Sequence, residues 1–208
     1  MIITHHTSQF FKITKGDLTI AINPVDKAID KKVSSFGTDI TLITTRHPQY
    51  YGVDTVTYGD KEPFVISGPG EYEAEGVFFK GIATKDMPEI DGKKYVNTVY
   101  SFTLDEIDVL FLGRLANKDL SGATMDEIRE PHILFISLEG ISSSDAGALA
   151  VKLSPAIVIP MDYGDEKSEV LQKFLKEMSA EGVEVQDKIT LKKKDVDGKE
   201  GEVVVLSS

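Results

Sequence analysis

The sequence contains no cysteine and only four histidines among its 208 residues. Without cysteine the chain forms neither disulfides nor thiolate metal sites, which is compatible with a reducing compartment. A membrane-spanning helix needs about 20 consecutive apolar residues, and no stretch of the sequence approaches that length. Residues 1–6 have no basic segment followed by an apolar run, so we expect no signal peptide. We therefore expect a cytoplasmic protein with no membrane partner.

Positive charge is also scarce. Lysine and arginine together number 23 against 34 aspartates and glutamates, which gives a formal net charge of -11. Such a surface repels phosphate backbones, so we expect no nucleic-acid partner. Hydrophobic residues make up 41% of the chain, enough to build a substantial core. We expect one globular domain that covers residues 1–208.

The first half of the chain reads mostly as strands and turns. Short β-rich runs, several of them bounded by glycine or proline, predict strands at 10–14, 18–22, 40–44, 64–66, 76–82, 96–103 and 107–112. The polar stretch 26–37 is compatible with a short helix or a loop. Residues 84–94, which are rich in charged residues and contain glycine and proline, predict a hairpin tip that forms a mobile loop.

The second half alternates between apolar runs and helical patterns. Strands are predicted at 133–136, 156–159, 189–191 and 203–206, and helices at 120–130, 146–153 and 165–181. The continuous apolar runs are typical of strands that are buried on both faces. This order favours sheets covered by helices, which is an α/β or α+β sandwich.

Several short motifs spread over nearly the whole chain carry a resemblance to a known family. They are the opening strand at 3–13, Ile22-Asn23-Pro24, the loop 41–52, residues 66–72, Gly113-Arg114 and Ile159-Pro160-Met161-Asp162-Tyr163. Their order resembles the metallo-β-lactamase superfamily, in the branch of small Zn-dependent hydrolases that includes ascorbate-6-phosphate lactonase-like proteins. The resemblance implies a four-layer αβ/βα sandwich of two mixed β-sheets flanked by helices.

The resemblance also implies where metal ligands would stand, and most of these positions carry other residues. The family presents a His-x-His-x-Asp-His loop, a bridging aspartate and a late histidine. The matching former metal-site positions here are Thr45, His47, Gln49, Tyr50, Arg114 and Asp162. Each zinc ion requires about four nitrogen or oxygen donors, so we expect no metal and no cofactor, and we assign no catalytic residue. If a metal binds, His47 and Asp162 are its candidate ligands.

The replacements reverse the local charge, because Arg114 stands at a carboxylate position and Asp162 at an imidazole position. We hypothesise that these two side chains, with His47, form an ion pair that fills the former metal centre. Tyr50 and Tyr51 are expected to fill the cleft.

Other polar motifs have structural explanations. His5 and His6 are neighbours in a predicted strand and should point to opposite faces, so they cannot easily share one ion. Ser142, Ser143 and Ser144 are better explained as a helix cap than as nucleophiles.

These observations lead to three functional hypotheses. The first is a metallo-β-lactamase-like protein with a degraded zinc site, a pseudoenzyme that acts in binding or as a structural protein. The second is a metal-dependent hydrolase of a small ester, lactone or phosphate-bearing substrate, which would use zinc at an unusual site. The third is an oligomeric scaffold, because the resemblance also implies homo-oligomers. The sequence identifies no small-molecule ligand.

Overall fold

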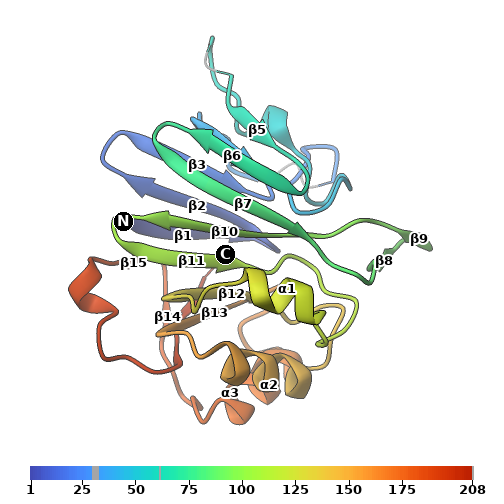
Figure 1. The fold of residues 1–208 in the computed structure, drawn as a ribbon, viewed down its shortest axis with the longest axis vertical. Coiled ribbons are helices and arrows are strands. Elements are labelled where there is room, and N and C mark those ends of the chain that lie inside the picture. Colours follow the sequence, from blue (N-terminus) through green and yellow to red (C-terminus); the bar gives the residue numbers. More distant parts are fainter. Residues whose placement is uncertain (30–32, 61, 208) are drawn as a thin grey trace.

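Two large β-sheets face each other in the computed structural model, which describes residues 1–29, 33–60 and 62–207 (Figure 1). The first sheet has the order β15-β1-β2-β3-β4-β5. Its strands are β1 (Ile2–Thr7), β2 (Phe10–Lys15), β3 (Leu18–Ile22), β4 (Ile40–Leu42), β5 (Phe64–Ile66) and β15 (Ile189–Thr190). Strands β1, β2 and β3 pair antiparallel, whereas β3, β4 and β5 are parallel. The first sheet is therefore mixed, as expected.

The second sheet contains seven strands in the order β16-β13-β12-β11-β10-β7-β6. Its strands are β6 (Gly70–Ala74), β7 (Val77–Ala83), β10 (Thr98–Leu104), β11 (Ile107–Phe111), β12 (Ile133–Ser137), β13 (Ile157–Met161) and β16 (Glu202–Val203). The meander β6-β7-β10-β11 is antiparallel, and β11, β12, β13 and β16 are parallel. Two small ribbons pair β14 (Val185–Gln186) with β17 (Val205–Leu206), and β8 (Glu89–Ile90) with β9 (Lys93–Lys94).

The main core lies between the two sheets, and a second core lies under the helices. Along the parallel strands the side chains alternate between the two cores, because neighbouring residues of a strand face opposite sides. Phe111 and Phe135 point into the inter-sheet core, whereas Leu110 and Leu134 pack toward the helices. The apolar runs predicted at 133–136 and 156–159 are thus buried on both faces, as expected.

Helices α2 (Ser143–Leu153) and α3 (Glu169–Glu177) cover the outer face of β12 and β13 (Figure 1). Ser142 caps α2 by accepting a hydrogen bond from the Asp145 backbone N–H at 3.1 Å, which confirms the predicted cap. Helix α3 is shorter than the predicted 165–181, because Ser168 caps its first turn and the chain reaches a left-handed residue at Ser179.

Helix α1 (Gly122–Glu127) is likewise shorter than the predicted 120–130, with Ser121 as its cap. The outer face of the first sheet packs against Val25, Phe36 and Val56 from connecting segments. Residues 30–32 of the stretch 26–37, for which a helix and a loop were both considered, lie outside the described residues. No helix in the described ranges is long and apolar enough to span a membrane.

One prediction concerns Gly52, in the loop that precedes the 3-10 turn at Val53–Thr55. A Cβ atom at this position would lie 2.3 Å from the backbone carbon and oxygen of Val25. Its φ of -93° suits any residue, so only the contact opposes a side chain. We expect Gly52→Ala to lower the free energy of unfolding by about 3 kcal/mol.

Urea unfolding followed by circular dichroism measures this loss. Gly122→Ala is the control, because nothing lies within 4 Å of its Cβ position and alanine favours a helix. Equal stability of the two variants would contradict the close approach of the two loops.

Candidate functional site

The candidate site lies at the rim where the carboxyl ends of the parallel strands of both sheets meet. In the second sheet, β11 leads to Arg114, β12 ends at Ser137, and β13 leads to Asp162. In the first sheet, β3 leads to Asn23, and the β1–β2 turn contributes Ser8 and Gln9. Parallel strands commonly present functional side chains at this edge. The rim therefore gathers residues that are far apart in the sequence.

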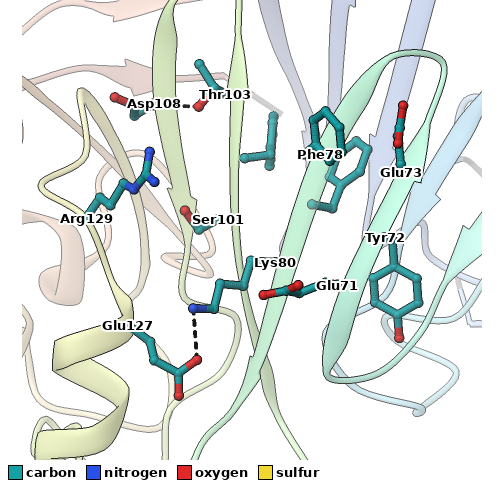
Figure 2. A pocket seen from close by; sticks show the side chains of 12 residues that line it. Glu71, Tyr72, Glu73, Phe78, Lys80, Ser101, Thr103, Asp108, Glu127 and Arg129 are labelled. Atoms are coloured by element: carbon teal, nitrogen blue, oxygen red, sulfur yellow. Dashed lines mark hydrogen bonds and ion pairs between the residues drawn. The ribbon is translucent and has the colours of Figure 1, made fainter.

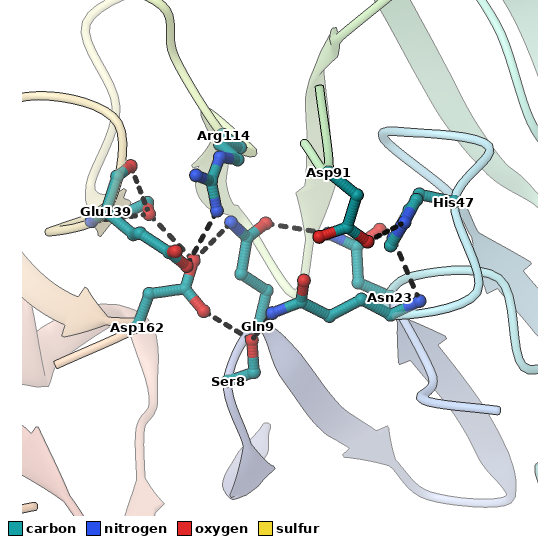
Figure 3. A network of polar contacts seen from close by, with 10 residues as sticks. Ser8, Gln9, Asn23, His47, Asp91, Arg114, Glu139 and Asp162 are labelled. Carbon is teal, nitrogen blue, oxygen red and sulfur yellow. Dashed lines mark hydrogen bonds and ion pairs between the residues drawn. The ribbon is translucent and has the colours of Figure 1, made fainter. Parts of the chain in front are cut away.

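Asp162 is the centre of this rim. Its carboxylate accepts hydrogen bonds from the Ser8 hydroxyl, from Gln9 Nε2 at 2.5 Å and from Ser137 Oγ at 2.7 Å (Figure 3). The residue has a φ of +57°, a left-handed conformation that is uncommon outside glycine, asparagine and aspartate. The β1–β2 turn and the ends of β12 and β13 are thus joined through one carboxylate.

The network continues from Asp162 into the first sheet through two amides. Asn23 Nδ2 donates to Gln9 Oε1 at 2.9 Å and to Thr44 Oγ1 at 2.8 Å. The Thr44 backbone N–H donates in return to Asn23 Oδ1 at 2.8 Å. Gln9, Asn23 and Thr44 are all buried, so their polar groups need such partners. We call the set Ser8, Gln9, Asn23, Thr44, Ser137 and Asp162 the amide network.

Burial shifts the protonation of the central carboxyl. Burial raises the pKa of Asp162 above its usual value, and the donors Ser8, Gln9 and Ser137 offset this shift only in part. In the amide network the carboxyl receives only neutral donors, so no positive partner stabilises its charged form.

Arg114 forms an ion pair with Glu139 and not with Asp162. The distance from Arg114 Nη1 to Glu139 Oε2 is 2.7 Å. Among the described residues no ion pair joins Arg114 to Asp162, so the hypothesis of an Arg114–Asp162 pair was wrong. The reason is that Glu139, which follows β12, supplies the carboxylate that pairs with Arg114. Glu139 was not among the site residues predicted from the sequence. Burial lowers the pKa of Arg114, but Glu139 and Tyr50 outweigh it and the pKa is raised overall.

His47 lies across the amide network from Asp162 (Figure 3). Its Nε2 is 3.3 Å from Asp91 Oδ2, and its Nδ1 accepts from the Gln49 backbone N–H at 3.3 Å. Its ring also contacts Tyr95 edge-on, with centroids 5.2 Å apart. His47 therefore contacts Asp91 and Tyr95 at the ribbon of β8 and β9, and it takes no part in the expected ion pair.

Asp162 and His47, the two candidate metal ligands, line separate hollows. Asp162 lines a cavity of about 360 Å³ together with His5, Ser8, Gln49 and Glu139. His47 lines another, of about 310 Å³, with residues that do not include Asp162. The structure therefore does not bring His47 and Asp162 to one cavity.

The remaining former metal-site positions carry neutral groups. Thr45 is buried, with Oγ1 3.5 Å from Asn97 Oδ1, and Gln49 Nε2 donates to Ser8 Oγ at 3.4 Å. Tyr50 is fully buried and fills space in the rim, whereas Tyr51 is 40% exposed. Burial raises the pKa of the Tyr50 phenol.

The two adjacent histidines point to opposite faces of β1, as predicted. His5 stacks on Phe11 at 4.5 Å, whereas His6 stacks on Phe10 at 4.8 Å and on Phe36 at 5.0 Å. Burial lowers the pKa of His6 to about 4. Both residues are therefore packed into their surroundings on different sides of the sheet and cannot share an ion.

Comparison with known proteins places this geometry in a family. Residues 2–162 match the protein family described as the beta-lactamase superfamily domain. The chain belongs to the metallo-β-lactamase superfamily. The fold agrees with this assignment, because two large mixed sheets with few helices also occur in its structural neighbours. A search of curated proteins finds no match.

Three solved structures show the similarity. One is a proposed Zn-dependent hydrolase of this superfamily from Thermotoga maritima, with 26% identity, a TM-score of 0.75 and coverage of 99% of this chain and 97% of the other. A proposed metal-dependent hydrolase from Parabacteroides distasonis shares 18% identity at a TM-score of 0.66, covering 98% and 91%. A metallo hydrolase from Ignicoccus hospitalis shares 16% identity at a TM-score of 0.61, covering 92% and 99%.

The residues of this superfamily member do not fit a zinc centre. Zinc needs several deprotonated nitrogen or oxygen donors that converge on one point. Within the described residues, no group of three or more His, Cys, Asp or Glu could hold a metal ion. Asp162 already accepts three hydrogen bonds, and Arg114 places a cation at the same rim. The donor set therefore disagrees with the metal that the family name implies.

Four residues of the site, namely Gln9, Thr44, Ser137 and Glu139, were not predicted from the sequence. Three of them have a signal that could have identified them. Gln9 follows Ser8 in the opening segment 3–13, one of the motifs that carry the resemblance. Ser137 and Glu139 follow an apolar run, and the carboxyl end of a buried parallel strand commonly carries site residues.

A first prediction from the site concerns Gln9, which connects the carboxylate of Asp162 to the amide of Asn23. Gln9→Ala removes one donor to a buried carboxylate and one acceptor of a buried amide. We expect the free energy of unfolding to fall by about 2 kcal/mol. Urea unfolding measures it, and Gln172→Ala on the exposed face of α3 is the control, with an expected change within about 0.5 kcal/mol. Equal changes in the two variants would argue against the network.

A second prediction concerns pH. Because folding raises the pKa of Asp162, the folded state binds a proton more tightly there than the unfolded state. The stability from this site is complete below the unfolded pKa of about 4 and is lost as the pH rises through the higher folded value. We expect the stability of the wild type, relative to Asp162→Asn, to decrease from pH 4 toward neutrality. Urea unfolding at several pH values measures the difference, and a pH-independent difference contradicts the shifted carboxyl.

Proposed function

We propose that this member of the metallo-β-lactamase superfamily is a pseudoenzyme that acts as a binding or structural protein. The observation that carries the proposal is the amide network. Hydroxyl and amide donors saturate the Asp162 carboxylate at the rim where the resemblance places the metal. Such a site is arranged to hold the ends of two sheets together and offers few free lone pairs to a metal ion.

The charges at the rim support the same proposal. Hydrolysis at a zinc centre requires an activated water molecule next to a strong cation. Here the cation is the guanidinium of Arg114, which is bound to Glu139 and cannot activate water in this way. The fully buried Tyr50 also takes up space in the rim. No step of a hydrolytic mechanism follows from these residues.

The competing candidate is a metal-dependent hydrolase of a small ester, lactone or phosphate-bearing substrate. The names of the structural neighbours support it, because several are described as hydrolases. Its ligands would have to be His47 and Asp162, which line separate hollows. An oligomeric scaffold stays a further prediction.

Metal titration tests the proposal. The protein is purified, stripped of metal by a chelator and titrated with zinc and with manganese by calorimetry, while elemental analysis gives the metal content of the untreated sample. We expect less than about 0.1 equivalents of either metal and no binding at micromolar concentrations, because too few donors converge.

The same sample is assayed for hydrolysis of ester, lactone and phosphate substrates with and without zinc. One equivalent of zinc at sub-micromolar affinity would overturn the proposal. The decisive control is Asp162→Asn: zinc binding that this substitution abolishes would identify the rim as a true metal centre and favour the hydrolase.

A further inference from the structure

A hollow of about 480 Å³ lies away from the rim. It is on the outer face of the second sheet, over β6, β7, β10 and the start of β11 (Figure 2). A volume of this size is within the range of sites that bind small molecules. None of the residues placed at the former metal site lines it. The hollow is therefore a separate candidate site.

The floor of the hollow is the outward face of the antiparallel meander. Side chains alternate along the strands, so Tyr72, Phe79 and Phe102 pack toward the inter-sheet core. The residues between them face outward, and Phe78 is 69% exposed. Phe78 therefore offers an apolar surface on the floor of the hollow.

The charges on the walls of the hollow fall into two groups. Lys80 Nζ pairs with Glu127 Oε2 at 3.0 Å, and Asp108 accepts from Thr103 Oγ1 at 2.6 Å. These groups already have partners across the floor. Lys80 lies two residues after Phe78 on β7, so these two side chains share the outward face of the strand.

Three charged side chains have no such partners. Glu71 and Glu73 on β6 and Arg129 in the segment after α1 form no ion pair with a described residue. Glu71 and Glu73 lie on one side of the hollow and Arg129 lies on the opposite side (Figure 2). The hollow thus has two unpaired carboxylates on one side, the ring of Phe78 beside them and one unpaired guanidinium on the opposite side, where Glu127 and Asp108 already have partners.

The geometry points to a short peptide with free termini as the ligand of this hollow. Its ammonium group binds at Glu71 and Glu73, its carboxylate binds Arg129, and an apolar side chain packs on Phe78. The four neighbouring strands β6, β7, β10 and β11 have a spacing of about 4.8 Å and span about 14 Å, and an extended residue covers about 3.5 Å, so about four residues cross the floor of the hollow. This inference rests on the proposed binding role and gives that role a site.

The probe for the test is the peptide Ala-Phe-Ala-Ala with free termini, titrated into isotope-labelled protein and followed by NMR. We expect saturable shifts confined to β6, β7, β10 and the segment around Arg129. Acetylation of the amino terminus should weaken binding about threefold, the scale of one exposed charge pair. Amidation of the carboxyl terminus and replacement of phenylalanine by alanine should also weaken it.

Variants of the protein assign each contact. Glu71→Gln with Glu73→Gln should weaken the free peptide about threefold and leave the acetylated peptide unaffected, because the two changes remove the same interaction. Arg129→Gln should weaken binding of the free peptide and leave binding of the amidated peptide unaffected. Phe78→Ala should weaken binding of the free peptide and leave binding of tetra-alanine unaffected. Glu181→Gln with Glu184→Gln is the charge-matched control at exposed positions outside the hollow. Circular dichroism verifies the fold of each variant.

Three results would overturn the inference: no saturable binding, shifts outside the hollow, or equal affinity for the free and blocked peptides. A weakening by the control variant equal to that of the β6 variant would show a non-specific charge effect and overturn it as well. The proposed absence of a zinc centre is measured separately by metal titration. A protein that binds neither zinc nor the peptide would therefore refute this site and leave the proposed pseudoenzyme standing.

Discussion

The hydrogen bonds around the Asp162 carboxylate are the constraint on which the rim of this fold depends. The β1–β2 turn and the ends of β3, β4, β12 and β13 meet there, and their polar groups are buried or half-buried. A buried polar group without a partner costs more free energy than a good hydrogen bond contributes, so the network must be complete. Because it crosses from one sheet to the other, it also limits how the two sheets can move relative to each other at this edge.

Neutral donors and a metal ion would hold this rim by different physical means. A metal binds several ligands strongly at one point but requires deprotonated donors. The amide network spreads the same connection over hydroxyls and amides, each contributing modestly. Arg114 and Glu139 add an ion pair at the side of the network, with 47% of the glutamate side chain exposed. This arrangement keeps the architecture of the superfamily, and the described residues contain no converging set of metal ligands.

The rim and the outer face of the meander differ in how far their polar groups are paired. At the rim, internal hydrogen bonds occupy the Asp162 carboxylate, and the two remaining candidate ligands line different hollows. The buried Tyr50 hydroxyl and Arg114 Nε at the same rim have no hydrogen-bond partner among the described residues. On the outer face of the meander Phe78 is exposed, and Glu71, Glu73 and Arg129 lack ion-pair partners among the described residues. The hydrogen-bonded carboxylate favours stability, whereas the exposed ring and the unpaired charges of the hollow offer contacts to a ligand.

The sequence by itself determined most of the strands, the two-sided burial of β12 and β13, the cap of α2 and the resemblance to the superfamily, because these depend on local periodicity and on short motifs. It also showed that the positions of most metal ligands carry other residues. Only the tertiary structure decided the partners of those residues. Arg114 meets Glu139 and Asp162 meets Gln9 because the ends of separate strands converge at one rim, a result of sheet packing over long sequence distances. Loop geometry likewise turned His47 toward Asp91, and no local pattern encodes that contact.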